Sequence, residues 1–293
     1  MSNQLQHLFK RFLPNSHRKG PTMLILGTAK AGTTTLFNVL NTLPGFAGAR
    51  LKEPRYFSMD YYYQQGPEWY HKQFDEEAHG IKFEATPHYL YFPAVPGRVY
   101  AYQQAMKRQI KFLVLLREPT SRCYSAWNME RSFHQNRPTE IIERHYQYYN
   151  PDIRTSLTAL LQAETFPSFE QAVADDIARL ENKDPLLEPS FVRKGLYAEQ
   201  VVRWLERFDM QNFCFIEFRE LADPLALLKK LEHFLGVKIG PNPTLPDDLR
   251  QNAGEYPALS DEDRQTMAML KRLYAPYNEK LFQLIGKRYD WND

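Results

Sequence analysis

The sequence predicts an α/β protein: a three-layer α/β/α domain with a central parallel sheet and a P-loop-like strand–loop–helix near its start. Short apolar runs typical of buried parallel strands recur along the chain. Stretches with helical apolar spacing lie between them, and a loop of small residues joins the first run to the first helix. Strands that alternate with helices favour a parallel sheet covered on both faces.

The elements follow in order. Strands are predicted at 23–26, 81–84, 111–116 and 213–218. Helices are predicted at about 32–43, 120–133, 197–208, 225–235 and 261–285. Because ligands of parallel sheets bind at the carboxyl ends of the strands, the residues that follow each strand are the functional candidates. These are residues 30–35, 84–88, 117–125, Arg219 and Glu220.

The chain is expected to hold one main domain. Residues 1–21 are interpreted as a basic tail and residues 22–293 as a single domain. The long polar stretch 135–190 is interpreted as a mainly helical insertion or lid, where acceptor specificity could lie. Cys123 and Cys214 fall in apolar or helical stretches, which favours buried free thiols in a reducing compartment.

Charge, hydropathy and histidine spacing argue against three kinds of function: nucleic-acid binding, membrane insertion and metal chemistry. A formal net charge of only +2 argues against bulk electrostatic capture of nucleic acid. No long apolar run stands near the start of the chain, so we expect no integral membrane association and a cytoplasmic location. The histidines lack metal-ligand spacing, so no metal is expected. The oligomeric state is left open.

The loop at 27–35 reads Gly-Thr-Ala-Lys-Ala-Gly-Thr-Thr-Thr. Small residues let backbone N–H groups approach an anion, and the helix N-terminus adds partial positive charge. Gly27 and Gly32 have the Walker A spacing, but the lysine precedes the second glycine instead of following it. The pattern predicts a phosphate loop unlike that of an ATPase. Its anion-binding residues are predicted to be Lys30, Ala31, Gly32, Thr33, Thr34 and Thr35.

Residues 27–36 resemble the 5′-phosphosulfate loop of the sulfotransferases that use 3′-phosphoadenosine-5′-phosphosulfate (PAPS), in particular the heparan sulfate and bacterial branch. Residues 115–127 resemble the family's 3′-phosphate segment, with Arg117 and Ser125 at the positions that hold this phosphate. The resemblance implies PAPS as co-substrate. A lysine at the bridging oxygen, here Lys30, could then stabilise the leaving phosphate without a metal.

Two further segments carry the catalytic candidates. Residues 84–89 resemble the family's Glu-Lys-Thr-Pro-x-Tyr segment, which implies that Glu84 is the general base. His88 is the alternative base and a candidate substrate contact. Lys52 begins a segment that resembles the one following the family's first helix, and it is a second candidate substrate contact.

The resemblance extends to the end of the chain, but the sequence departs from the animal heparan sulfate enzymes, whose Golgi anchor, late disulfide loop and basic Lys-Gly-Arg segment have no match in it. Residues 194–197 resemble the family's Gly-x-Tyr segment, and Arg193, Lys194 and Tyr197 are candidate donor contacts. Residues 277–291 resemble its last helix and Asp-Trp ending. The basic Lys-Gly-Arg segment of the animal enzymes has no match at 252–257, which leaves a heparan acceptor open to question.

The sequence therefore predicts a sulfotransferase that moves a sulfuryl group from PAPS to a hydroxyl or amine of a saccharide or other small molecule. One alternative is a P-loop kinase or NTPase, which would bind magnesium–ATP tightly. The other is a non-catalytic nucleotide- or carbohydrate-binding module. This module would keep Arg117 and Ser125 but would not need Glu84.

Overall fold

The computed structural model describes residues 19–136, 138–239 and 256–291. Most of the predicted tail and residues 252–255 lie outside these ranges. The chain forms two compact units, Met1–Arg117 with Val202–Asn252 and Glu118–Val201 with Ala253–Asp293. We call them the sheet unit and the helical unit. The prediction of a single domain over 22–293 stays a prediction.

The sheet unit holds a five-stranded parallel sheet in the order β2-β3-β1-β4-β5. The predicted strands are all present, and the short edge strand β2 is additional. Between Ile25 and Gly27 the pairing of β1 with β4 shifts in register, at the point where the chain leaves the sheet for the glycine loop. The strands are β1 Met23–Gly27, β2 Phe46–Gly48, β3 Ile81–Ala85, β4 Lys111–Leu116 and β5 Phe213–Glu217.

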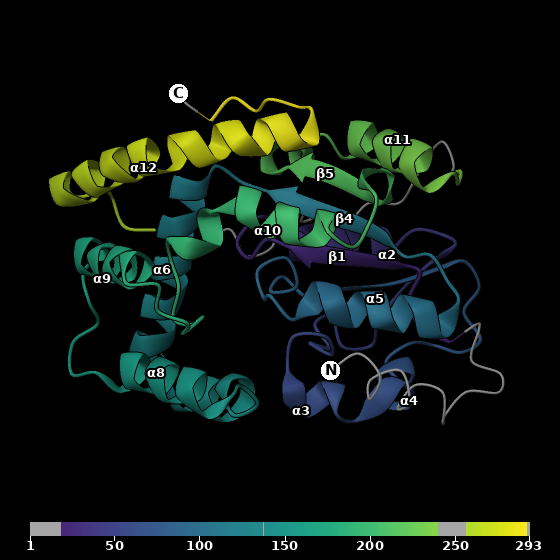
Figure 1. Ribbon diagram of the computed structural model, residues 1–293, viewed down its shortest axis with the longest axis horizontal. Coiled ribbons are helices and arrows are strands. Elements are labelled where there is room, and N and C mark those ends of the chain that lie inside the picture. Colours follow the sequence, from purple (N-terminus) through teal and green to yellow (C-terminus); the bar gives the residue numbers. More distant parts are fainter. Residues whose placement is uncertain (1–18, 137, 240–255, 292–293) are drawn as a thin grey trace. The chain divides into compact units, whose positions relative to one another are not determined.

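Helices cover both faces of the sheet, which confirms the predicted three-layer α/β/α class (Figure 1). Alternate residues of a strand point to opposite faces. Leu113 and Leu115 of β4 belong to the apolar cluster formed with α2 and α11. Phe112 of β4 points the other way and packs on Trp204 of α10, with ring centroids 5.1 Å apart. The helices are α2 Thr33–Asn41, α5 Val95–Met106, α11 Pro224–Leu235 and α10 Tyr197–Leu205, which belongs to the sheet unit only from Val202 onward.

The remaining sheet-unit helices are short, and the sequence did not reveal them. They are α3 Asp60–Tyr63, α4 Gly66–His71, and the 3-10 helices η4 Met210–Asn212 and η5 Phe218–Ala222. The longer α5 was also missed, although its buried residues Val95, Val99, Tyr102 and Met106 have helical spacing. Pro96 and Gly97 in its first turn are poor helix formers and weaken the local signal.

The helical unit contains the stretch 135–190, which is mainly helical in the described residues. Its core lies among α6, α9 and α12, where Trp127, Phe169 and Leu270 belong to one buried cluster. Ser168 and Gln171 form a reciprocal capping box at the start of α9. The elements are α6 Pro119–Asn136, α7 Pro138–Ile141, the π-helix η2 Ile142–Tyr146, α8 Pro151–Gln162, α9 Phe169–Glu181, the 3-10 helix η3 Arg193–Gly195 and α12 Asp261–Ile285.

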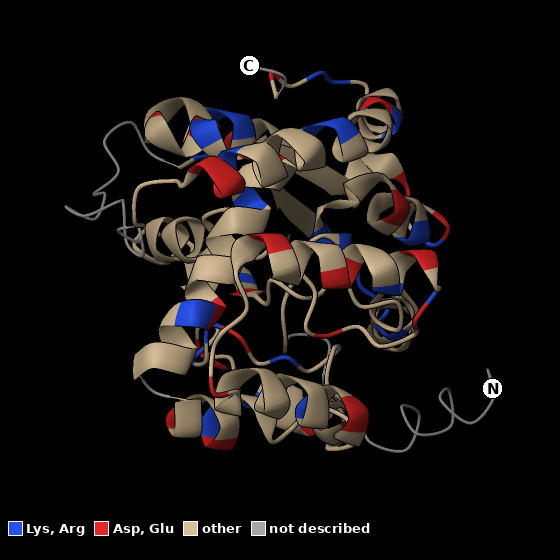
Figure 2. Cartoon of the chain, turned by 90° about the vertical axis from the view of Figure 1, so that its left-hand side faces the viewer, with Lys and Arg blue, Asp and Glu red and all other residues tan. Residues whose placement is uncertain are grey.

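Surface charge and helix hydropathy agree with the composition. Lys and Arg are interspersed with Asp and Glu on the ribbons of the side shown in Figure 2. Among the described residues, no helix is both long and apolar enough to cross a membrane.

Candidate active site

The glycine loop between β1 and α2 is shaped by left-handed backbone. Gly27 has φ 129°, and a Cβ there would lie 2.3 Å from the carbonyl oxygen of Pro87. Only glycine therefore lets the end of β1 approach the segment that follows β3. Lys30 and Gly32 have φ values of 71° and 82°. Thr28 N donates to Leu115 O over 2.7 Å, which ties the loop to β4.

The N-terminus of α2 has no side-chain cap. Its N-cap, Gly32, has no side chain that could accept from the first turn, and that turn contains no acidic residue. The first N–H groups of a helix lack intrahelical partners, and together with the helix dipole they favour negative charge. Lys30 and Thr34 are half-buried, whereas Ala31, Thr33 and Thr35 are buried. The predicted strand–loop–helix is therefore present, and the role of its residues toward an anion stays a prediction.

Arg117 braces this loop from the end of β4. Its Nη1 donates to the carbonyl oxygen of Lys30 over 3.1 Å. Its guanidinium lies over the Phe218 ring, 4.8 Å from the centroid. The sequence predicted a 3′-phosphate contact for Arg117. In the structure, its guanidinium contacts the glycine loop at 27–35, and its role toward the 3′-phosphate stays a prediction.

Glu84, the predicted base, lies at the end of β3 and is fully buried, with 0% of its surface exposed. Tyr70 Oη donates to its Oε1 over 3.0 Å, and Thr86 Oγ1 donates to its Oε2 over 2.8 Å. Burial raises the pKa of Glu84 to about 7, and hydrogen bonds from Tyr89, Thr86 and Tyr70 keep it from rising further. The carboxyl group of Glu84 therefore has a pKa near neutral pH, and the hydroxyls of Tyr70 and Thr86 donate to its two oxygens.

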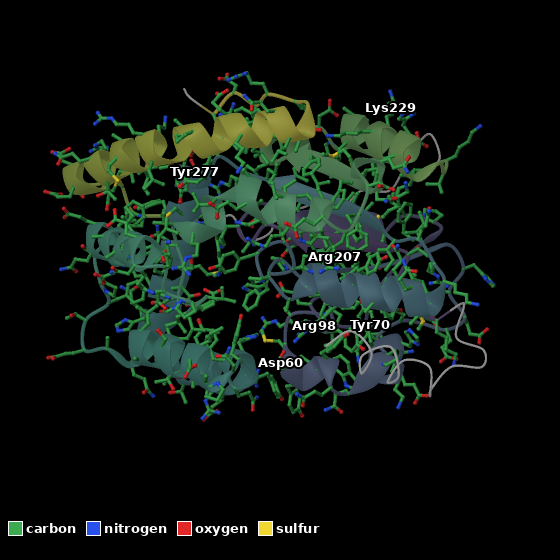
Figure 3. The ribbon with its side chains drawn as sticks, in the orientation of Figure 1. Asp60, Tyr70, Arg98, Arg207, Lys229 and Tyr277 are labelled. Carbon is green, nitrogen blue, oxygen red and sulfur yellow. The ribbon has the colours of Figure 1, made fainter. Side chains whose placement is uncertain are left out.

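Aromatic packing holds Tyr70, one of the two hydroxyl donors, against Glu84. Tyr70 of α4 stacks on Tyr56 with ring centroids 4.4 Å apart and an interplanar angle of 7°. Arg98 of α5 fastens the same segment, because its Nη1 donates to Phe57 O over 3.1 Å and its Nη2 pairs with Asp60. Figure 3 shows Arg98 and Asp60 pointing toward each other. The hydrogen bond of Tyr70 to Glu84 could not be predicted from the sequence, because it depends on tertiary packing of α4 against β3.

A second carboxylate lies nearer to solvent. Glu53 has 27% of its side chain exposed and pairs with Lys52 Nζ at 2.8 Å and with Arg55 Nη2 at 3.4 Å. Burial alone would raise the pKa of Glu53, but the charges of Lys52 and Arg55 outweigh it and hold the pKa below its ordinary value. Backbone bonds join this segment to β3, since Ala85 N donates to Lys52 O over 3.1 Å. Lys52 is therefore near the predicted base, while Glu53 and Arg55 were missed although their segment had been singled out.

His88, the alternative base, is half-buried. Its ring lies edge-on to Phe92, with centroids 5.9 Å apart at 87°. Among the described residues, no group of three or more His, Cys, Asp or Glu side chains could hold a metal ion. Both cysteines are buried free thiols.

Ser125 lies on α6 in the helical unit and is only 1% exposed. Its Oγ lies 2.6 Å from the hydroxyl of Tyr256. Arg122, one turn earlier, is fully buried, and its Nη2 donates to Phe191 O. The guanidinium of Arg122 thus holds the backbone at Phe191.

The three remaining donor candidates are held inside the helical unit. Arg193 Nη1 donates to Asp184 O over 2.9 Å. Lys194 pairs with the buried carboxylate of Glu188. Tyr197 is 1% exposed, and its ring packs against Trp291 with centroids 6.0 Å apart. Their roles toward the donor stay predictions.

Comparisons with known proteins identify the class. The sequence model of the family described as "Sulfotransferase domain" matches residues 21–253, so the chain belongs to this family. It is similar to the heparan sulfate glucosamine 3-O-sulfotransferase 5 of Mus musculus, at 26% identity over 97% of this chain and 82% of the relative. It is also similar to the membrane-associated sulfotransferase kil1 of Dictyostelium discoideum, at 24% identity over 93% of this chain and 67% of that one.

A solved structure shares the fold. The sulfotransferase from Alicyclobacillus acidocaldarius superimposes with a TM-score of 0.64, at 23% identity, over 93% of this chain and 99% of that chain. The predicted PAPS-dependent sulfotransferase family is thereby confirmed, and the protein is an enzyme that transfers sulfuryl groups. The kinase or NTPase and non-catalytic alternatives are not favoured.

Proposed function

We propose that the protein transfers a sulfuryl group from PAPS to a hydroxyl or amine of a carbohydrate or small-metabolite acceptor by in-line displacement. The observation that supports this most is the loop at Lys30. An acid-free, uncapped helix N-terminus and a lysine converge there, and Arg117 holds the loop in place. Such a site favours an anion without needing a metal.

The loop residues would act on the leaving group. The acceptor oxygen or nitrogen attacks sulfur, and the bond between sulfur and the bridging oxygen of the 5′-phosphate breaks. The products are the sulfated acceptor and 3′-phosphoadenosine-5′-phosphate (PAP). Lys30 and the N–H groups of the loop stabilise the charge that develops on the 5′-phosphate. Arg117, Ser125, Arg193, Lys194 and Tyr197 are proposed for the 3′-phosphate and adenosine end, which would select PAPS over ATP.

A carboxylate is proposed to take the acceptor proton, and two carboxylates compete for the role. Glu84 has a pKa of about 7, which suits a base at neutral pH. However, its full burial means that an acceptor must displace the hydroxyls around it. Glu53 is already partly exposed and stands between two cations. Its exposure is the specific observation that favours it as the second candidate.

The acceptor side is proposed more broadly. The name of the Mus musculus relative includes a glucosamine acceptor, which supports a saccharide for this chain. Lys52, beside Glu53, and His88 are proposed as acceptor contacts. Cytoplasmic location also stays a proposal.

A transfer assay with ³⁵S-labelled PAPS tests the function. The acceptor panel should contain amino sugars, neutral saccharides, phenols and aliphatic alcohols. We expect label on at least one acceptor, and loss of that transfer in Lys30→Ala. Lys72→Ala, which removes an exposed lysine of the same unit, is the matched control. Label transfer that survives Lys30→Ala would contradict the assignment of the loop.

A further inference from the structure

A pocket of about 220 Å³ lies beside the starts of β1 and β3. The glycine loop follows the other end of β1, whose five residues span roughly 16 Å at about 3.3 Å per residue. The pocket is therefore separate from the candidate active site. Its lining residues all belong to the sheet unit and are Gly20, Thr22, Ala78, His79, Gly80, Lys82 and Arg108.

The lining of this pocket is cationic. Lys82 and Arg108 carry positive charges at neutral pH, and His79 gains one when it is protonated. Among the described residues that line the pocket, none is an aspartate or a glutamate. Arg108 is fixed beside the pocket, because its Nη1 donates to the carbonyl oxygen of Gly20 over 2.8 Å. A lining of this composition favours an anion.

Lys82 is the lining residue whose state most clearly indicates a ligand. Only 6% of its surface is exposed, and lysine is rarely buried to this extent unless a carboxylate pairs with it. Its Nζ donates to the carbonyl oxygen of Glu76 over 3.1 Å, and it forms no salt bridge within the described part of the chain. That carbonyl takes one of the three N–H donors of the ammonium group, which leaves two for a ligand.

The carboxylate of Glu76 does not neutralise this charge. It pairs with Lys19 Nζ at 2.8 Å and not with Lys82. The buried side chain of His71 is sensitive to the same charges. Its pKa is lowered to about 4, first by burial and then by Arg108 and Lys19, while Glu76 opposes the shift. The cations of this region therefore outweigh Glu76.

We propose that this pocket binds a tetrahedral oxyanion, a sulfate or phosphate group, through Lys82, Arg108 and His79. An ionised group of this kind only accepts hydrogen bonds, and bonds from cationic donors to charged oxygens are short and strong. The proposal goes beyond sulfuryl transfer and does not depend on PAPS as the donor. A free ion and a sulfate ester both offer this chemistry, and the test separates them.

Calorimetric titration with sodium sulfate and with sodium phosphate tests the proposal. Lys82→Met keeps an unbranched side chain and removes the charge. It should raise the Kd of the anion about 10-fold or more, the loss of one hydrogen bond to a charged group. Arg108→Gln should also raise this Kd. Lys72→Met is the matched control, since Lys72 is an exposed lysine of the same unit, and it should bind the anion like wild type.

The carrier of the anionic group is identified by titration with glucosamine 6-sulfate. If this ester binds more tightly than inorganic sulfate and Lys82→Met removes the difference, the pocket takes a sulfate ester. If it binds equally or more weakly, the pocket takes the free ion. Unsulfated glucosamine is the control ligand, and Lys82→Met should not change its Kd.

Two outcomes would overturn the proposal. Because the glycine loop is itself proposed to bind an anion, Lys30→Ala is titrated in parallel. Anion binding that Lys30→Ala abolishes and Lys82→Met leaves unchanged would place the anion at the glycine loop alone. A wild type that binds neither sulfate nor phosphate would make Lys82 a structural residue. If Lys82→Met does not fold, an unchanged Kd in Arg108→Gln contradicts the proposal in its place.

Discussion

The loop at 27–35 and the segment at 193–197 were both assigned to the donor, but they are built in different ways. The loop is a backbone site: positive φ at Gly27, Lys30 and Gly32 leads into an uncapped helix. The segment instead offers charged side chains, and both already have partners in the protein. Lys194 pairs with Glu188, and Arg193 donates to the carbonyl oxygen of Asp184. A backbone site is prepared for an anion, whereas a paired cation must first leave its partner.

The largest expected effect concerns the base beside the loop. Removing the true base should lower kcat by about 10²- to 10⁴-fold. If Glu84 is the base, kcat/KM rises with pH up to about 7, levels off above it, and Glu84→Gln abolishes the rise. If Glu53 is the base, the profile is flat above about pH 6, since its pKa lies below the ordinary value.

The control for this prediction is the other carboxylate. Glu84→Gln and Glu53→Gln are assayed side by side over the same pH range. A kcat that neither substitution lowers would show that no carboxylate at this site takes the proton.

The next effect concerns Lys30. Lys30→Ala should lower kcat by about 10²- to 10³-fold, the range measured when one group that stabilises developing negative charge is removed. Lys30→Arg should retain part of the activity because the positive charge remains. The free energy of unfolding should change less than the activation free energy, because Lys30 is not fully buried. A stability loss as large as the kinetic loss would mean that Lys30 mainly holds the fold.

The next prediction concerns Lys194 and tests whether the segment at 193–197 is structural, in contrast to the loop at 27–35. Lys194 and Glu188 have only 12% and 5% of their side chains exposed, so Lys194→Met leaves a buried carboxyl without its partner. We expect a loss of about 3 kcal/mol in the free energy of unfolding, measured by urea denaturation. Adding Glu188→Gln should recover part of it. An unchanged stability with a raised Kd for PAP would instead make Lys194 a donor ligand.

The smallest effect is a dependence of stability on pH. The pKa of Glu84 is about 7 in the folded protein against 4.5 for an ordinary glutamate, so the folded state binds more protons between these values. Stability therefore falls as pH rises through this window, by at most about 3 kcal/mol from this group. Urea denaturation at pH 5 and pH 8 should show a smaller fall in Glu84→Gln than in wild type. Equal falls would contradict the raised pKa.

The sequence predicted what local patterns determine. The strand at 111–116 and the helix at 261–285 were predicted with their observed bounds, because a long apolar run and a capped amphipathic pattern are local signals. The edge strand β2, with three half-buried residues, and the short helix α4 were missed because tertiary contacts stabilise them.

The same division holds for the candidate site. The loop at Lys30 could be predicted because glycine spacing and the strand–helix context are written in consecutive residues. Partners such as Tyr70 for Glu84, Glu188 for Lys194 and Tyr256 for Ser125 could not be predicted. Residues 6 to 131 positions apart meet in these pairs only through packing of the folded chain.

The most direct test of the central claim is a calorimetric titration of the wild-type protein with PAP and, separately, with magnesium–ATP. We expect PAP to bind in the micromolar range and magnesium–ATP to bind at least tenfold more weakly, because the loop places its lysine before the second glycine and the donor site is proposed to hold a 3′-phosphate. Tight binding of magnesium–ATP with no response to PAP would contradict the account and return the chain to the kinase or NTPase interpretation.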